Sequence, residues 1–156
     1  MIRATELGRV CEFNAIAGIG REYRNVDPDA IQFNLIKEEF KELQEGIDDN
    51  DRKEVVDALG DLLVVVGGAI NYLGYDPDEV LKIINDSNMS KFCDNEEDAI
   101  QSVEAYEDSE EYRDVHYRKV RGRYVIYGYK KDVTVSCKPK ILKGIHYQPS
   151  KLGEIL

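Results

Sequence analysis

Residues 35–61 read LIKEEFKELQEGIDDNDRKEVVDALGD, and this stretch predicts two helices joined by a short polar turn. Apolar residues recur at helical spacing before and after the break QEGIDDNDRK at 44–53, where Gly46 and a run of polar residues interrupt the pattern. Each helix also carries acids spaced three or four positions apart, so that each set shares one face. These acids are Glu39 and Glu42 on the first helix, and Glu54, Asp57 and Asp61 on the second.

The first acidic pair lies away from the predicted water-facing side of its helix. The spacing assigns an apolar stripe and a solvated side to this helix, and Glu39 and Glu42 belong to neither. The pair instead flanks Leu35, on a second and partly apolar side. The apolar stripe consists of Phe33, Ile36, Phe40, Leu43 and Ile47, and the solvated side consists of Lys37, Lys41 and Gln44.

The second helix continues into residues 62–70, LLVVVGGAI, which have no polar side chain and therefore predict burial on all sides. Asp61 is in line with Val64 and Gly68, one and two turns later, so we expect it to point toward the interior. Buried carboxylates without partners are costly, and two of them about 4 Å apart repel by roughly 4 kcal/mol at an effective dielectric near 20. The pattern therefore favours a bound cation over a solvated acidic face.

The ligand type indicates which cation would bind. Carboxylate oxygens suit Mg²⁺ or Mn²⁺ better than zinc or copper. A di-iron site of the ferritin kind would need Glu-x-x-His, and the two histidines, His116 and His146, lie far downstream. Because Mg²⁺ held by a few carboxylates is usually completed by water and phosphate oxygens, the acids predict a phosphate-bearing ligand.

The same residues resemble the MazG-like all-α nucleoside triphosphate pyrophosphohydrolases, which are relatives of phosphoribosyl-ATP pyrophosphohydrolase. The family pattern is ExxE, a spacer, and then ExxD on two adjacent helices. The runs DALGDLLVVV at 57–66 and SNMSKF at 87–92 are similar to a branch of the family common in phages and bacteria. The matching acids are Glu39 and Glu42 for the first half of the pattern, and Glu54, Asp57 and Asp61 for the second.

The resemblance implies a Mg²⁺-dependent hydrolase that converts a nucleoside triphosphate into a monophosphate and pyrophosphate, with Mn²⁺ able to substitute. The matching acids would hold one or two ions, with Glu54 either a ligand or a neighbour of the ligands. Glu38 or Glu42 would take the proton of the attacking water. The expected catalytic set is Glu38, Glu39, Glu42 and Asp61. The family resemblance also implies a homodimer or homotetramer, and the two apolar sides of the first helix agree with this.

Four residues outside the acidic set are predicted to bind substrate. Asn14 follows Phe13 where relatives often have a His near the nucleotide base. Asn85, Asn88 and Lys91 recur every three residues, and they could supply amide contacts to base or sugar and one ammonium for phosphate. The alternative readings are a core role for Phe13 and, for the polar row, a helix end that meets water.

The fold class expected from these signals is mainly α. A MazG-like bundle of four to five helices is predicted at 1–93, followed by a small α+β extension at 94–156 whose strands form a β-meander. Helices are predicted at 4–18, with Thr5 as N-cap, from Asp27 and Pro28 to Ile47, and from Asp51 or Arg52 to Gly74. A fourth helix is predicted to begin at Asp76, which forms a capping box with Glu79. A fifth is predicted at 94–107, with Asp94 as N-cap. Strands are predicted at 116–120, 123–129 and 132–137, with a turn at Arg121–Gly122 and a brief helix from Ser150.

Composition bounds the partners. The formal net charge of −10 argues against a nucleic-acid partner, although metal ions could still bring free nucleotides in. We therefore expect no nucleic acid, and we interpret the tyrosine-rich strands as a packing or oligomer surface rather than a platform for single strands. The absence of a signal peptide and of a long apolar run predicts no membrane contact. The odd number of cysteines predicts reduced thiols in the cytoplasm of a bacterial cell or a phage-infected host.

Two other classes of function stay open at this point. A non-catalytic nucleotide or metal sensor would bind phosphates without activating water, and a helical interaction protein would use neither. Ala58 stands where many relatives have Glu, and this departure keeps the sensor possible. The sequence does not name the base, the sugar or the biological purpose, for which nucleotide-pool control, removal of damaged nucleotides and alarmone breakdown are all compatible.

Overall fold

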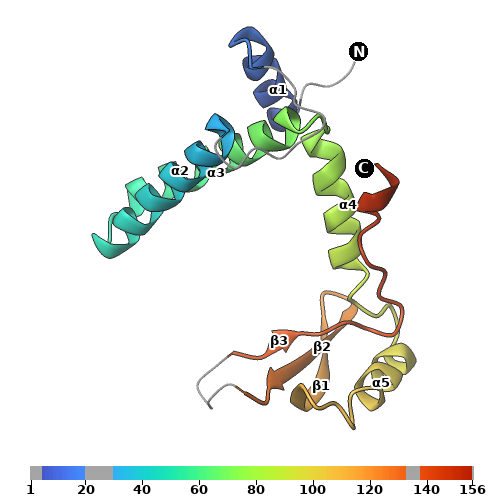
Figure 1. Ribbon diagram of the computed structural model, residues 1–156. Helices are drawn as coiled ribbons and strands as arrows, with labels where there is room; N and C mark the ends of the chain where they lie inside the picture. Colours follow the sequence, from blue (N-terminus) through green and yellow to red (C-terminus); the bar gives the residue numbers. More distant parts are fainter. Residues whose placement is uncertain (1–4, 20–29, 133–137, 156) are drawn as a thin grey trace. The chain divides into compact units, whose positions relative to one another are not determined.

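The computed structural model describes residues 5–19, 30–132 and 138–155 (Figure 1). The chain divides into two units, Met1–Leu81 and Lys82–Leu156. In chain order the elements are α1 (Glu6–Ile16), α2 (Ile31–Asp48), α3 (Arg52–Tyr72), α4 (Pro77–Met89), α5 (Glu96–Glu104), β1 (Tyr112–Val120), β2 (Arg123–Lys130), β3 (Lys140–Ile141) and the short 3₁₀ helix η1 (Leu152–Glu154). A mainly helical core followed by a small antiparallel sheet is the fold class that the sequence predicts, and it is confirmed.

Local signals set most helix ends in the first unit. Thr5 caps α1, and its hydroxyl accepts a hydrogen bond from the Gly8 amide. Asp51 caps α3, because its carboxylate accepts from the amides of Lys53 and Glu54 at 2.9 and 3.1 Å. Gly74 ends α3 with φ of +92°, a conformation that favours glycine. These predicted ends are confirmed.

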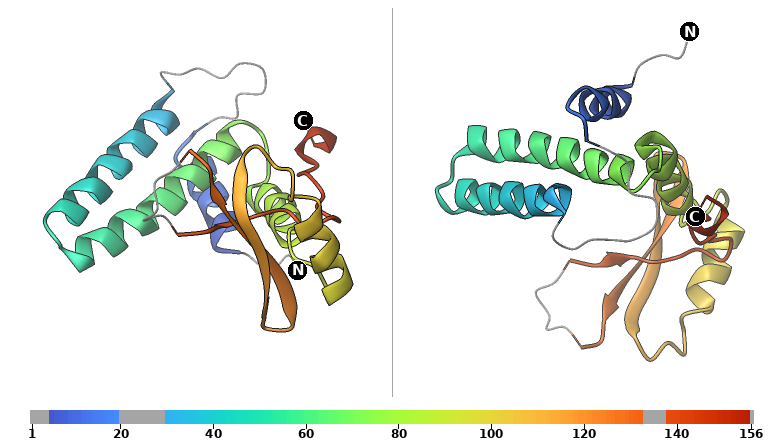
Figure 2. Two further views of the ribbon diagram at one scale, coloured as in Figure 1. Left: turned by 90° about the horizontal axis from the view of Figure 1, so that it is seen from below. Right: turned by 45° about the horizontal axis from the view of Figure 1, so that its top comes forward.

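The helices α2 and α3 lie side by side along their length, as both views of Figure 2 show. Beside the turn, a Cβ at Gly46 would lie 3.1 Å from Val55 N and 3.2 Å from Glu54 Cβ, so the helices are close together there. Ala58 is 1% exposed in the seam between them. At the far end, the rings of Phe33 and Tyr72 meet edge to face at 6.5 Å. This hairpin brings the two acidic sets of the sequence onto facing helices.

The helix α1 packs on α3 at a pair of glycines. A Cβ at Gly67 would lie 3.1 Å from Leu7 Cδ2, so the missing side chain permits the close approach. Beside it, the buried Asn14 amide donates a hydrogen bond to the Gly68 carbonyl at 3.2 Å. A core role was one of the interpretations of Phe13. Its side chain is 64% exposed in the single chain.

Three details of the helical part differ from the sequence-based expectation. The helix α2 begins at Ile31 after an extended Ala30, whereas the predicted start at Asp27 and Pro28 lies outside the described residues. Burial of 62–70 on all sides is wrong for the part of the chain that the structure describes, because among its elements only α1 and α2 pack on α3, and Leu63 is left 69% exposed. Asp61 likewise is exposed rather than directed into an interior.

By length and composition alone, α3 is apolar enough to cross a membrane, with a mean hydropathy of 1.5 over an 18-residue window. Core helices of globular proteins meet the same criterion. Asp57 and Asp61 lie within α3, and α2 runs along it.

The second unit is a three-stranded antiparallel sheet, in the order β1–β2–β3, with α5 against one face. Arg121 and Gly122 form the hairpin turn with positive φ at both positions, as the sequence predicts. The core between helix and sheet contains Cys93, Ala99, Tyr124, Ile126 and Leu142. The strand β3 is Lys140–Ile141; of the predicted strand 132–137, Asp132 lies in a turn and 133–137 lies outside the described residues.

The C-terminal segment ties the end of α4 to the sheet. The Ser87 hydroxyl donates to the Gln148 carbonyl at 2.8 Å, and the Ser90 hydroxyl accepts from the Gln148 amide at 2.9 Å. The Gly144 amide donates to the Lys91 carbonyl at 3.0 Å. The second unit therefore begins inside α4, earlier than the boundary predicted after residue 93, because Ser87 of α4 and the two residues after the helix, Ser90 and Lys91, contact the C-terminal segment.

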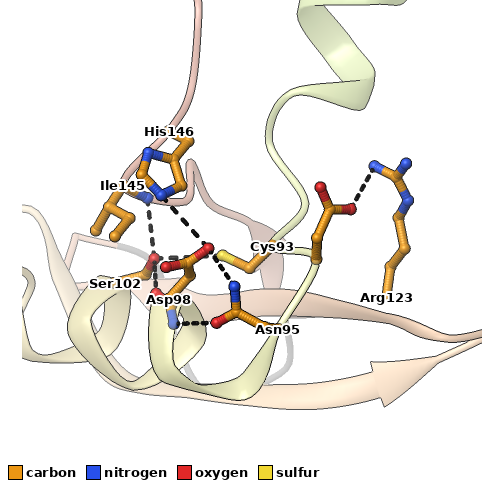
Figure 3. A network of polar contacts seen from close by, with 8 residues as sticks. Cys93, Asn95, Asp98, Ser102, Arg123, Ile145 and His146 are labelled. Atoms are coloured by element: carbon orange, nitrogen blue, oxygen red, sulfur yellow. Dashed lines mark hydrogen bonds and ion pairs between the residues drawn. The ribbon is translucent and has the colours of Figure 1, made fainter.

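A polar network joins α5 to the same segment (Figure 3). Ser102 is 1% exposed, and its hydroxyl donates to the Asp98 carbonyl at 2.6 Å and accepts from the Ile145 amide at 2.9 Å. The N-cap of α5 is Asn95, which accepts from the Asp98 amide, and not Asp94 as predicted. Asp94 instead forms an ion pair with Arg123 at 3.3 Å. The predicted brief helix near the C-terminus is η1.

Candidate functional site

Glu39 is the most unusual acid of the helical hairpin. It lies in the middle of α2, half-buried, and its Oε2 is shielded from solvent without a hydrogen-bond partner among the described residues. A buried carboxylate oxygen without a partner costs free energy, and native proteins rarely leave one unless an ion, a water molecule or a ligand completes it.

The neighbours of Glu39 are also acidic. Burial raises the pKa of its carboxyl, and the charges of Glu42, Asp61, Glu38 and Asp57, in that order, raise it further. These four acids come from both helices of the hairpin, so the structure brings all of the predicted catalytic and metal-binding acids except Glu54 near Glu39. A cation at this position would remove the repulsion that raises the pKa.

Two positions of the family pattern have other surroundings. Glu54 is not among the acids that raise the pKa of Glu39; its side-chain stem lies against Gly46 beside the turn. Ala58, where relatives have Glu, is closed into the seam between α2 and α3. Asp57 is therefore better placed than Glu54 to complete the set around Glu39.

The acids interact electrostatically, but their side chains do not converge into a formed metal site. Within 5–19, 30–132 and 138–155, no three acidic, histidine or cysteine side chains converge closely enough to hold an ion. Like charges on facing helices repel, which favours side-chain positions that keep them apart. The donor set and the unpartnered Glu39 oxygen nevertheless fit a hard divalent cation, which binds carboxylate oxygens.

A hollow of about 600 Å³ runs along one side of α3, and Asp57 and Asp61 both line it. Gly60 lies between them and leaves open space where a side chain would stand. Arg52 and Lys53 line the same hollow at the N-terminal end of the helix. These two cations were not among the predicted site residues, although Arg52 lies one turn before Val56 and Lys53 one turn before Asp57 on α3. They can neutralise an anion that approaches the acids.

The predicted substrate-binding residues occur in both units. Asn14 is buried in the first unit, where its amide bonds to Gly68. Asn85 and Asn88 are exposed on α4 in the second unit, and Lys91 follows it. Lys91 Nζ donates to Asn88 Oδ1 at 2.8 Å, so these two side chains form a pair. Their roles in substrate binding stay predictions.

A second polar cluster contains a serine, a histidine and an aspartate but is not arranged for nucleophilic catalysis. His146 Nε2 lies 3.4 Å from Asp98 Oδ2, whereas the hydroxyl of Ser102 is bonded to backbone groups and closed off from solvent (Figure 3). A nucleophilic serine needs a base within hydrogen-bond reach and access to substrate. This network therefore stabilises the fold.

Comparison with known proteins finds a family match for part of the chain. Residues 23–88 match the phosphoribosyl-ATP pyrophosphohydrolase family. This family belongs to the MazG-like superfamily of nucleotide pyrophosphohydrolases, and the matched segment includes all of α2 and α3. The match covers less than half of the chain. It indicates a pyrophosphohydrolase-type family for the helical hairpin that carries the acids.

One curated relative is an uncharacterized protein of Acanthamoeba polyphaga mimivirus. It is 31% identical over 99 residues, which cover 61% of this chain and 37% of the relative. The chain thus spans little more than a third of the length of that relative. No solved structure matches the chain.

Proposed function

We propose that the protein is a Mg²⁺-dependent nucleoside triphosphate pyrophosphohydrolase that releases a monophosphate and pyrophosphate, with Mn²⁺ able to replace Mg²⁺. The observation that carries this proposal is the buried, unpartnered oxygen of Glu39 among carboxylates from two helices. The match of the same two helices to a pyrophosphohydrolase family supports it.

In this proposal Glu39, Glu42, Asp57 and Asp61 hold one or two ions. When bound, Mg²⁺ polarises a phosphate group and lowers the pKa of a bound water. Glu38 is exposed and adjacent to Glu39, so its carboxylate is free to accept the proton of the attacking water, with Glu42 as the alternative base. Glu54, against Gly46, would orient its neighbours rather than bind the ion.

The cations of α3 would help to bind the phosphates. Arg52 and Lys53 line the hollow that also contains Asp57 and Asp61, and their charges favour a polyphosphate over a neutral ligand. Asn14 and the α4 residues Asn85, Asn88 and Lys91 remain the proposed contacts for base, sugar and phosphate.

A nucleotide sensor is the second candidate, and one observation favours it. Ala58 is fully enclosed in the helix seam, so the chain lacks one carboxylate of the family pattern where it would face α2. A site with fewer ligands could bind a metal–nucleotide complex without activating water. Turnover separates the two candidates.

We also propose that the protein is a homo-oligomer, a dimer or a tetramer. Along α3, Val56, Leu59 and Leu63 are 62, 47 and 69% exposed, and they recur at helical spacing as one apolar stripe. Burying a leucine or valine side chain stabilises a structure by about 1.5–3 kcal/mol. Packing of this stripe against the same stripe of a second chain would therefore be favourable. The stripe belongs to the same helix as Asp57 and Asp61, and its first residue, Val56, lines the same hollow as these acids.

The proposed biological role is nucleotide-pool control or removal of unwanted nucleotides in the cytoplasm. The direct test is a panel of ribo- and deoxyribonucleoside triphosphates incubated with the protein and Mg²⁺, with the products separated by anion-exchange chromatography. The proposal expects monophosphate and pyrophosphate in equal amounts, abolished by EDTA. Diphosphate and orthophosphate would indicate a different hydrolase, and metal-dependent binding without any product would favour the sensor.

A further inference from the structure

The charge of the chain is divided unevenly between its two units. Residues 1–81 contain eighteen Asp and Glu against eight Lys and Arg, which accounts for the whole net charge of −10. Within the balanced second unit, residues 94–111 contain nine acids and no Lys or Arg, whereas residues 112–143 contain ten Lys and Arg and two acids. The net charge of the whole chain therefore does not describe residues 112–143, which are strongly basic. It does not argue against an anionic partner for the sheet that these residues form.

The two faces of the sheet have different neighbours. Among the described elements only α5 packs on it, and α5 covers the face that contains Tyr124 and Ile126. Residues paired directly across antiparallel strands point to the same face. The pairs on the opposite face, which we call the open face, are Arg113 with Tyr129, His116 with Tyr127, Arg118 with Val125, and Val120 with Arg123. The open face thus presents a basic row on β1 beside two half-buried tyrosines on β2, although Val125 within it is only 7% exposed and His116 Nε2 is shielded from solvent.

A β-bulge creates this arrangement. The register shifts between Arg113 and His116, and Asp114 within the bulge has φ of +53°. Side chains three positions apart on a regular strand point to opposite faces. The extra residue brings Arg113 back to the open face, in line with His116 and Arg118. Bulges often serve to redirect side chains in this way.

Guanidinium groups and aromatic rings stack on one another along the open face. The Arg113 guanidinium lies 5.4 Å from the centre of the Tyr129 ring, and that of Arg118 lies 5.8 Å from the centre of Tyr127. The His116 ring stacks on Tyr127 at 5.7 Å with an angle of 27° between the planes. Unpaired bases stack on aromatic rings and on guanidinium planes, whereas the bases of a duplex are not available for this contact.

The arginines of the open face also retain charge for a ligand. No carboxylate lies within ion-pair distance of Arg118 in the described part of the chain, whereas Arg113 pairs with its neighbour Asp114 at 2.7 Å, with side chains that are 37 and 67% exposed. Arg123 pairs with Asp94 at 3.3 Å, but both side chains are exposed, and exposed pairs contribute only about 0–1 kcal/mol. Phosphate groups can therefore compete for these guanidinium groups.

We propose that the open face binds single-stranded nucleic acid. Arg113, Arg118 and Arg123 contact backbone phosphates, and Tyr127, Tyr129 and His116 provide stacking surfaces for bases. This binding is independent of the acids of α2 and α3 and of any metal ion, so it does not rest on the proposed hydrolase activity.

The test is fluorescence anisotropy of the full-length protein with a labelled single-stranded mixed-sequence oligonucleotide in EDTA, over a series of salt concentrations. The double variant Arg118→Gln/Arg123→Gln should weaken binding at least tenfold and reduce the slope of log affinity against log salt by about 1.4, because each phosphate contact contributes about 0.7 for single strands. Tyr127→Leu should weaken binding by about tenfold through lost stacking. Circular dichroism verifies that each variant is folded.

The matched control is Lys119→Gln/Lys130→Gln, which removes two charges from the same strands on the face that α5 covers. This control should keep affinity within about twofold, and a duplex of the same sequence should bind more weakly than the single strand. The proposal is overturned if no binding occurs at about 50 mM salt, if both charge pairs weaken binding equally, or if the duplex binds as tightly as the single strand.

Discussion

The charge of Asp61 on α3 raises the pKa of Glu39 on α2. Their helices are joined by a turn of only a few residues, yet the chain places two like charges on the facing surfaces of the hairpin. Such repulsion is costly in the isolated protein and is relieved by a cation or by a proton. The stability of the hairpin should therefore respond to both.

The response to protons has a definite sign. The folded-state pKa of Glu39 is raised above its ordinary value of 4.5, so between these two values the folded state binds more protons than the unfolded state. The stability that protonation of Glu39 contributes is present below pH 4.5 and is lost as the pH rises through the raised pKa. Urea unfolding in EDTA across this range should show wild-type losing stability relative to Glu39→Gln, which cannot titrate. Parallel pH curves for the two proteins would contradict the coupling.

The response to metal should appear in melting curves. Mg²⁺ or Mn²⁺ should raise the melting temperature relative to EDTA, because a ligand at 100 times its dissociation constant stabilises the folded state by about 2.7 kcal/mol. Asp61→Asn should reduce the shift, and Lys41→Gln, on the exposed side of α2, should preserve it. Identical melting with EDTA and with millimolar Mg²⁺ would count against the ion site.

The subunit contact can be tested on the apolar stripe of α3. Light scattering coupled to size-exclusion chromatography should give a multiple of 17.8 kDa for the wild-type chain. Leu59→Gln/Leu63→Gln should lower the mass toward that of one chain, because the exposed apolar surface that drives association is lost. Ile100→Gln, which removes from α5 an apolar side chain that is 44% exposed, close to the 47% of Leu59, should not. A wild-type protein that is monomeric at micromolar concentration would contradict the proposed interface.

A substitution at Gly144 tests how closely the C-terminal segment packs on the rest of the second unit. A Cβ at this position would lie 2.7 Å from Cys93 Sγ and 3.0 Å from the Lys91 carbonyl oxygen. Gly144→Ala should therefore destabilise the second unit by about 1–3 kcal/mol, as overpacking does in other cores. Gly153→Ala, where nothing lies within 4 Å, is the control, and urea unfolding is the measurement. Equal stability of both variants would show that the segment adjusts without cost.

The sequence was sufficient where a signal is local. Thr5, Asp51 and Gly74 set helix ends through their own hydrogen bonds or backbone conformation, and Arg121–Gly122 form the hairpin turn for the same reason. The sharing of a face by acids three or four residues apart also follows from helix geometry alone. For this reason the acids around Glu39 could be listed before the structure was known.

Other features depend on contacts distant in the chain. The exposure of Leu63 could not be predicted, because an apolar run is compatible with cover by the same chain or by another. The two-residue strand Lys140–Ile141 is too short to show a period of two, and its place is set by pairing with β2. The bulge beside Asp114 is a property of strand register, so the open face emerges only in three dimensions.

The central claim is that the carboxylates around Glu39 hold the ion that a nucleotide hydrolase needs. The most direct measurement is Mg²⁺-dependent pyrophosphate release by wild-type, Glu39→Gln and Asp61→Asn, with Lys41→Gln as control and folding checked by circular dichroism. Each acid variant should lower turnover by orders of magnitude while remaining at least as stable as wild-type in EDTA, because it loses charge needed in catalysis and relieves repulsion. Full activity in both Glu39→Gln and Asp61→Asn would show that the acids are a solvated surface and would contradict the account.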